Sequence, residues 1–258
     1  MGKVLYEEKN QIAYVTINRP EALNCFDYET LVQLQKIVEG LHINKEVRVV
    51  IFTGAGERAF SAGADLKERK TLNQTEVKRN VKAIRDVFSA IAALPQPTIA
   101  GINGYALGGG FELALACDFR YAVPAAKIGL TEVSWAIIPG AGGTQRLSRL
   151  IGPSKAMELI LTAKKIEAKE AYALGILNGV AESSQLIPTC EGLASAITAN
   201  GPIAVQQAKY AILHGSEVSL QSGLALEEKA YEVIIPTKDR MEALEAFIEK
   251  RKPNFKGE

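Results

Sequence analysis

A glycine-rich segment near the middle of the chain has the sequence Asn103-Gly104-Tyr105-Ala106-Leu107-Gly108-Gly109-Gly110-Phe111-Glu112. It follows a short run of strand-forming residues, 98–102, and opens a helical pattern that continues to Cys117. A glycine cluster between a strand and a helix exposes backbone N–H groups at the positive N-terminal end of that helix. Such a place stabilises negative charge, either on a bound phosphate or on an oxyanion that develops during a reaction.

Two other interpretations of the glycine cluster stay open at this point. A nucleotide-binding loop is disfavoured, because neither the GxGxxG spacing nor the GK[ST] ending of a P-loop is present. The glycines could also serve only the close packing of a helix, since glycine often marks such contacts. The cluster by itself therefore does not decide the chemistry.

Strand and helix patterns alternate on both sides of this segment, through residues 1–150. The patterns predict a hairpin over residues 4–17, a helix over 30–41, a buried strand over 47–52 and a charged helix over 74–94. This alternation predicts an α/β fold whose loops at strand ends are available for a site.

Helical patterns dominate from about residue 154. They cover residues 156–161, 168–174 and 203–213, and a last helix is predicted from Asp239, which with Glu242 resembles a capping box. We expect an α/β core over residues 1–190 that carries the site. A helical region over residues 191–258 would then pack against the core or against another subunit.

The composition is that of an ordinary globular protein, with 258 residues, 47% hydrophobic and 23% charged, and a formal net charge of +1. This near-neutral balance gives no reason to expect a nucleic acid or a membrane as partner. Sparse cysteines, the lack of a long apolar run and the lack of a signal-like start predict a cytoplasmic protein. His42 and His214 lie far apart and outside any metal-binding spacing, so we expect no metal site.

Two acids stand beside glycine loops in apolar surroundings. Glu112 follows the glycine cluster directly, and Glu132 precedes a second glycine-rich loop at residues 140–143. A lone glutamate at a helix start is usually a dipole partner. Two such acids instead suggest a general acid and base, although the sequence does not show that they meet. Trp135 is left open between the lining of a pocket and the core.

Four motifs carry a resemblance to a known family. They are Asn18-Arg19-Pro20, the segment Ala59-Phe60-Ser61-Ala62-Gly63-Ala64-Asp65-Leu66-Lys67, the glycine cluster ending in Glu112, and Glu132 followed by Pro139-Gly140-Ala141-Gly142-Gly143-Thr144-Gln145-Arg146. In this order they resemble the enoyl-CoA hydratase (crotonase) family over nearly the whole chain. The resemblance implies a spiral of repeated ββα units, followed by a C-terminal helical region that forms trimers.

The resemblance also implies roles for five residues. The backbone N–H groups of Ala64 and Gly109 would hold the thioester oxygen, and the N–H of Gly140 would help to hold water. Glu112 would help to activate that water, and Glu132 would supply the proton to the α-carbon. The expected reaction adds water across the double bond of a 2-enoyl-CoA, as in fatty-acid β-oxidation, and gives a 3-hydroxyacyl-CoA.

Coenzyme A is expected as part of the substrate, with no resident cofactor. By resemblance, its path is lined by Ala62, Ala64, Asp65, Leu66 and Lys67. Phe247 and Lys250 match tail positions that reach the CoA of a neighbouring subunit. The chain would then work as a homotrimer or as a hexamer built from two trimers.

Two further readings concern a particular group within the family. Residues 63–69, 136–140 and 235–240 resemble methylglutaconyl-CoA hydratases, whose substrate carries a branched chain and a distal carboxylate. That carboxylate needs a cation, which the sequence does not identify, so a general enoyl-CoA hydratase is preferred.

Members of this group also bind RNA through basic residues. The basic residues of the 74–94 helix are instead interpreted as a solvated face, because the net charge is nearly zero; they are Lys78, Arg79, Lys82 and Arg85.

Overall fold

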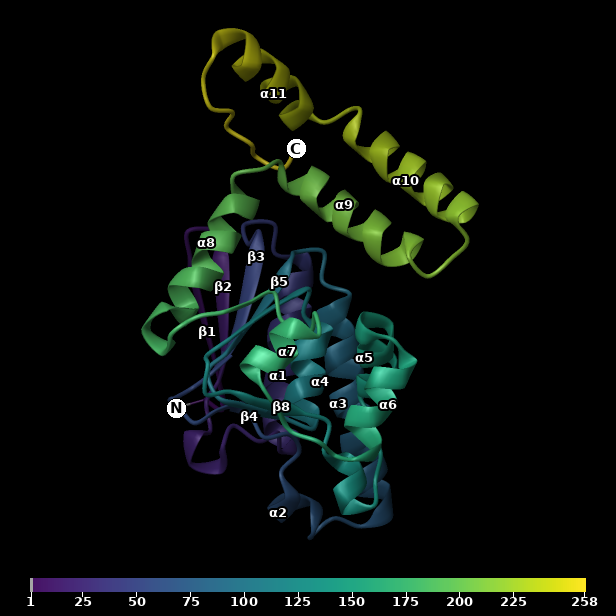
Figure 1. Ribbon diagram of the computed structural model, residues 1–258. Coiled ribbons are helices and arrows are strands. Elements are labelled where there is room, and N and C mark those ends of the chain that lie inside the picture. The colour runs from purple at the N-terminus through teal and green to yellow at the C-terminus, as the bar shows by residue number, and fades with distance from the viewer. Residues whose placement is uncertain (1) are drawn as a thin grey trace.

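The computed structural model describes residues 2–258, and its strands form two sheets (Figure 1). The six-stranded sheet has the order β1 (Val4–Lys9), β2 (Ile12–Ile17), β3 (Val49–Gly54), β5 (Thr98–Ile102), β7 (Phe119–Ala122) and β10 (Gly179–Val180). The four-stranded sheet has the order β4 (Ala59–Ser61), β6 (Tyr105–Leu107), β8 (Lys127–Gly129) and β9 (Ile166–Glu167). Strands β2, β3, β5, β7 and β10 run parallel, and β1 pairs antiparallel with β2.

A ββα unit occurs three times in succession. Strands β3, β5 and β7 each enter the large sheet, the next strand enters the small sheet, and a helix follows. These helices are α3 (Gln74–Ala92), α4 (Gly109–Ala116) and α5 (Gly143–Ile151). The expected spiral of repeated ββα units is therefore confirmed.

The large sheet is covered on both faces, which explains its continuous apolar strands. Val50 and Phe52 of β3 pack in the main core with residues of α1 (Tyr28–Ile43) and α3. Val49 and Ile51 point to the other face and pack with Cys190 of α8 (Leu186–Thr198). The boundary expected at residue 190 thus falls inside a helix that lies against the sheet.

Several short elements complete the core. They are η1 (Pro20–Ala22), α2 (Leu66–Arg69), η2 (Glu132–Trp135), α6 (Pro153–Leu161), α7 (Ala168–Ala173) and η3 (Ser183–Gln185). Asn10 and Gln11 both have positive φ, as a two-residue turn of the primed type requires, and this confirms the predicted hairpin.

Three C-terminal helices, which we call the arm, project beyond the sheets (Figure 1). They are α9 (Pro202–Gly215), α10 (Leu220–Ile234) and α11 (Lys238–Glu249). Helices α9 and α10 come close where Gly215 meets Gly223, and an added side-chain carbon at Gly215 would lie 3.6 Å from the Gly223 Cα. An ion pair of 2.6 Å between Lys209 and Asp118 ties α9 to the core.

The last helix is found within one residue of its predicted start, but the predicted cap of α11 is wrong. The capping residue is Thr237, whose hydroxyl accepts a hydrogen bond of 3.3 Å from the Arg240 N–H. Asp239 instead accepts N–H groups of the C-terminal tail, from Lys256 at 2.7 Å and from Gly257 at 2.8 Å. A short acid near a helix start can serve either purpose, and only the path of the tail decides.

No helix among residues 2–258 is long and apolar enough to cross a membrane.

Candidate active site

A cavity of about 1090 Å³ lies beside α3, the start of α4 and the loop that follows η2. Glu112, Glu132, Gly109 and Gly140 all line it. So do the residues predicted along the CoA path, which are Ala62, Ala64, Asp65, Leu66 and Lys67. The fold therefore brings together, in one cavity, residues that lie on four separate segments of the chain.

The backbone N–H groups of Ala64 and Gly109 lie on two segments in close contact. An added side-chain carbon at Gly63 would lie 3.0 Å from the Gly109 nitrogen, and one at Gly109 would lie 3.7 Å from the Ala64 nitrogen. Within the described residues 2–258, neither N–H donates to an acceptor. Two free donors at the N-terminal end of α4 are suited to hold a developing oxyanion.

The glycines of the cluster have different surroundings, some in close packing and some at the cavity. An added side-chain carbon at Gly110 would lie only 1.9 Å from the Ser61 carbonyl oxygen, so a larger residue would push α4 away from β4. Gly108 has a φ of +52°, and a side-chain carbon there would lie 3.2 Å from Glu132 Oε1. The packing interpretation is therefore confirmed for Gly110, whereas Gly108 and Gly109 line the cavity.

Glu112 is held in a fixed position by the loop before α5. Its side chain is buried, and its Oε1 accepts N–H groups from Ala141 at 2.8 Å and from Gly143 at 2.9 Å. Burial raises the pKa of Glu112, while these two donors and the nearby Arg146 oppose the rise. The donors favour the carboxylate form of this residue.

Glu132 has a different environment. It is the first residue of η2 and is buried, and its Oε2 has no hydrogen-bond partner within residues 2–258. Burial, and then the negative charge of Glu112, raise the pKa of Glu132 to about 7. The two acids thus interact: burial raises the pKa of both, but the two backbone donors favour the carboxylate of Glu112 relative to that of Glu132, so Glu132 is expected to keep its proton to higher pH.

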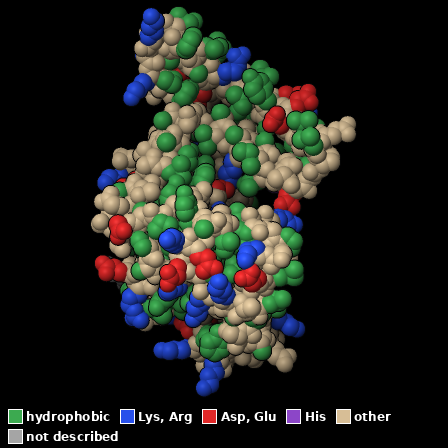
Figure 2. Space-filling model, viewed as in Figure 1, with side chains coloured by type: hydrophobic (Ala, Val, Ile, Leu, Met, Phe, Trp, Pro, Cys, Tyr) green, Lys and Arg blue, Asp and Glu red, His purple; other side chains and the backbone are tan. Residues whose placement is uncertain are grey.

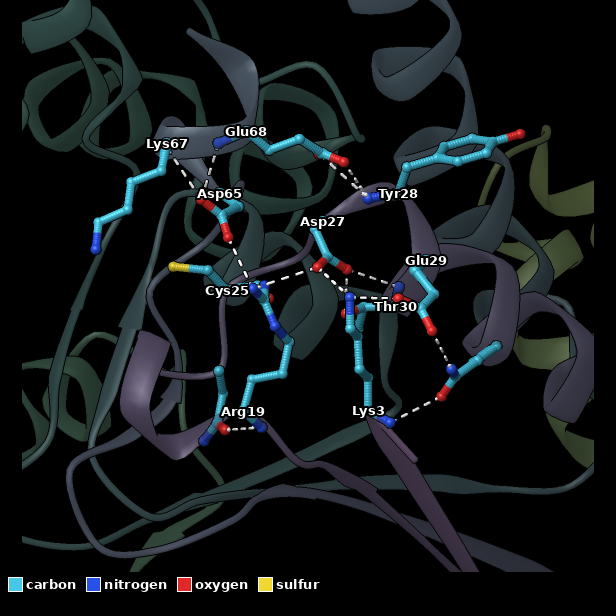
Figure 3. Close-up of polar contacts among 12 residues, drawn as sticks. Lys3, Arg19, Cys25, Asp27, Tyr28, Glu29, Thr30, Asp65, Lys67 and Glu68 are labelled. Atoms are coloured by element: carbon cyan, nitrogen blue, oxygen red, sulfur yellow. Dashed lines mark hydrogen bonds and ion pairs between the residues drawn. The ribbon is translucent and has the colours of Figure 1, made fainter. Parts of the chain in front are cut away.

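A buried ion network supports the segment that carries Ala64 (Figure 3). Arg19 Nη2 lies 2.9 Å from Asp65 Oδ2 and 3.2 Å from Asp27 Oδ2, and Arg19 Nη1 donates to the Cys25 carbonyl oxygen at 2.6 Å. Burial would raise the pKa of Asp65, but Arg19 and the backbone N–H groups of α2 outweigh it and lower that pKa. The carboxylate of Asp65 is therefore engaged by Arg19 and α2, although the residue lines the cavity.

The loop that holds Glu112 depends on a residue whose role the sequence did not reveal. Arg146 Nη1 donates to the Ala141 carbonyl oxygen at 2.8 Å, on the peptide next to the one that donates to Glu112. Arg146 stands in one of the quoted motifs, but its partner is a backbone atom that no side-chain pattern marks. Arg69 and Arg85, which also line the cavity, were likewise not proposed as cavity residues.

The remaining predicted residues divide into two groups. Lys67 is exposed at the cavity wall, and Trp135 also lines the cavity and is exposed, which favours its pocket interpretation. Phe247 and Lys250 do not line the cavity of this chain, and α11 lies at the opposite end of the molecule from α2 (Figure 1). A single chain thus does not bring these two residues to the acids.

The basic residues of α3 have individual surroundings. Arg79 stacks on the Tyr28 ring at 3.9 Å, Lys82 pairs with Asp86, and Arg85 lines the cavity.

In the part of the chain that the structure describes, no group of three or more His, Cys, Asp or Glu side chains is arranged to hold a metal ion.

Comparisons with known proteins agree with this geometry. A family model described as enoyl-CoA hydratase/isomerase matches residues 7–258. The Bacillus subtilis protein YngF, named for the same hydratase/isomerase group, is 54% identical over 98% of each chain. The human mitochondrial methylglutaconyl-CoA hydratase is 48% identical over 98% of this chain and 76% of the relative.

Solved structures show the same fold. The crystal structure of an enoyl-CoA hydratase from Bacillus anthracis matches with a TM-score of 0.97 and 48% identity, over 99% of this chain and 100% of that chain. A family match that spans nearly the whole sequence, together with this structural agreement, leads to one conclusion. The chain belongs to the enoyl-CoA hydratase/isomerase family.

Proposed function

We propose that this protein is an enoyl-CoA hydratase, which adds water to a 2-enoyl-CoA to give a 3-hydroxyacyl-CoA. The observation that carries the proposal is the pair of buried glutamates in one cavity, of which Glu112 accepts two backbone N–H groups and Glu132 has its pKa raised to about 7. Hydration needs a group that takes a proton from water and a group that delivers one to carbon. An isomerase needs only to move one proton, so two buried acids with different hydrogen-bonding environments favour hydration.

The proposed mechanism begins at the two free N–H groups. The thioester oxygen accepts from Ala64 and Gly109, and these donors stabilise the enolate that forms when water attacks the β-carbon. Glu112 takes a proton from the attacking water, which the N–H of Gly140 helps to hold. Glu132 delivers a proton to the α-carbon, and proton exchange with solvent then restores both acids.

The CoA portion is proposed to leave the cavity along the segment 62–67. Lys67 supplies a positive charge near the phosphates, and Ala62 and Leu66 contact the pantetheine and adenine path. Phe247 and Lys250 would complete the site from a neighbouring subunit in a trimer or a dimer of trimers. The 84% exposure of Phe247 in the single chain supports that assignment.

A methylglutaconyl-CoA hydratase is the second candidate. It is favoured by the 48% identity to the human protein of that name and by the arginines that line the cavity. In both candidates the reaction at the double bond is the same. The candidates differ only in the chemistry of the acyl end.

The test is the loss of enoyl-thioester absorbance when the protein is mixed with crotonyl-CoA. The wild type is expected to hydrate it, and Glu112→Gln and Glu132→Gln are each expected to lower kcat roughly 10²- to 10⁴-fold, because each removes one proton-transfer group. Glu57→Gln, an exposed change outside the cavity, serves as the control. A wild type that hydrates no enoyl-CoA, or glutamine variants that keep full activity, would refute the proposal.

A further inference from the structure

Four basic side chains line the cavity, and they differ in surroundings. Arg58, Lys67 and Arg85 are exposed, whereas Arg69 at the end of α2 is only partly exposed. Much of the remaining wall is apolar and includes Val77, Val81, Ile84, Ile137 and Ile138. Arg69 is therefore the basic residue that the cavity itself partly encloses.

The guanidinium of Arg69 is unlike that of every other arginine that is not exposed. Each of the others donates a hydrogen bond to a carbonyl or carboxylate oxygen; they are Arg19, Arg48, Arg120, Arg146 and Arg240. Among residues 2–258, the side chain of Arg69 has no hydrogen-bond partner, and only its backbone is bonded, through its N–H to the Asp65 carbonyl oxygen at 2.9 Å and its carbonyl oxygen to the Leu72 N–H at 3.3 Å. A partly buried cation without an acceptor is costly, so an anionic ligand is a natural partner for it.

The charge of Arg69 acts at the reacting end of the cavity. It is among the charges that influence Glu132, where it opposes the rise in the pKa of that acid. A cation in this place would meet the far end of a short acyl chain whose α-carbon lies beside Glu132.

We propose that Arg69 binds a carboxylate at the far end of the acyl chain, so that the cavity favours short 2-enoyl-CoA thioesters that carry a second acid group. The inference rests on the proposed hydratase function and deepens it. In 3-methylglutaconyl-CoA the carboxylate carbon is only two bonds from the β-carbon, and therefore close to Glu112 and Glu132. A second negative charge beside the Glu112 carboxylate is unfavourable without a cation, and the planar fork of arginine fits a carboxylate with two hydrogen bonds.

The kinetic test compares 3-methylglutaconyl-CoA with 3-methylcrotonyl-CoA, which has the same branch and no carboxylate. In Arg69→Gln, the ratio of kcat/KM for the acidic to the neutral thioester is expected to fall roughly 10- to 100-fold, because two charge-assisted hydrogen bonds are lost. Arg69→Lys restores part of the ratio, since it keeps the charge and loses the fork. The matched control is Lys70→Gln, the same change of charge at the next residue, which does not line the cavity.

A binding measurement separates this role from any effect on Glu132. Glutaryl-CoA and butyryl-CoA are saturated and cannot be hydrated, and only glutaryl-CoA carries the distal carboxylate. By titration calorimetry, Arg69→Gln is expected to weaken glutaryl-CoA roughly 10- to 100-fold more than it weakens butyryl-CoA. This measurement does not depend on catalysis, so it stands even where the proposed hydratase function fails.

Three results would overturn the inference. The first is an equal loss on acidic and neutral thioesters, which would mean that Arg69 acts only through Glu132 or through the fold. The second is a selective loss in Arg85→Gln instead, which would place the carboxylate at the rim. The third is a wild type that hydrates crotonyl-CoA and binds glutaryl-CoA no better than butyryl-CoA, which leaves the hydratase function intact and removes the proposed selectivity.

Discussion

The core buries its apolar side chains, whereas the arm leaves many of its own exposed. In β3 the four residues from Val49 to Phe52 are completely buried between α1, α3 and α8. In the arm, Leu220, Phe247 and Ile248 are 79%, 84% and 78% exposed, and Figure 2 shows hydrophobic side chains spread over this part of the surface. The core thus completes its own packing, whereas the arm presents apolar surface of the kind that marks an interaction site.

The same contrast divides the predicted site. Every residue with a proposed role at the double bond lies in the core and lines the cavity of a single chain. The two tail residues proposed to reach CoA lie on or next to α11, away from that cavity. The difference suggests that chemistry is built within one chain and that binding of the long substrate is completed between chains.

The largest effect is expected from placing charge on the arm, which tests whether its apolar surface holds subunits together. Phe247→Asp combined with Ile248→Asp is expected to reduce the mass measured by light scattering to that of one chain, because each side chain contributes about 1.5–3 kcal/mol when buried. The KM for crotonyl-CoA should rise at least about tenfold as the shared CoA contacts are lost.

The matched control is Val32→Asp, which introduces the same charge at an apolar residue that is half exposed on α1 of the core. It should leave the mass unchanged. If the double arm variant keeps the mass and KM of the wild type, the arm does not serve assembly.

Removing the buried cation that supports Ala64 tests the core side of the comparison. Arg19→Gln leaves Asp27 and Asp65, both largely buried, without their guanidinium, so the free energy of unfolding should fall by about 3 kcal/mol. Arg19 positions the segment that carries one of the two oxyanion donors, and kcat should therefore fall more than KM rises. Urea unfolding and steady-state kinetics provide the two readouts.

Arg19→Lys separates positioning from charge alone. It keeps a positive charge but loses the two-sided contact with Asp65 and the Cys25 carbonyl oxygen. Recovery of stability without recovery of kcat supports the positioning role. Unchanged kcat in both variants would show that Arg19 matters only for folding.

The sequence predicted what depends on ordered motifs and missed what depends on tertiary contacts. Glu112, Glu132 and the loops around them were found because their residue types and spacing are local. Helix α10 was missed, since Gly223 interrupts its pattern and several of its apolar residues remain exposed in the single chain. Arg69 was not proposed as a cavity residue because an arginine without a partner looks the same in sequence as a solvated one.

The smallest expected effect concerns the stability that the core loses by burying the acid Glu132. Glu132 has its pKa raised from 4.5 to about 7, so its ionised form is disfavoured in the folded protein. The contribution of this group to stability is fully present below about pH 4.5 and is lost as the pH rises through about 7. Glutamine cannot ionise, so Glu132→Gln should gain about 2 kcal/mol over the wild type between pH 5 and pH 8.

Urea unfolding of both proteins at equal concentration measures this difference, with Glu57→Gln as the exposed control. A gain that grows with pH in Glu132→Gln alone shows that the folded core stores free energy at this residue in order to keep a proton for the α-carbon. A gain that does not vary with pH means that the buried carboxyl is not held neutral. Glu112 would then have to supply the proton to the α-carbon, which would reverse the division of roles between the two glutamates.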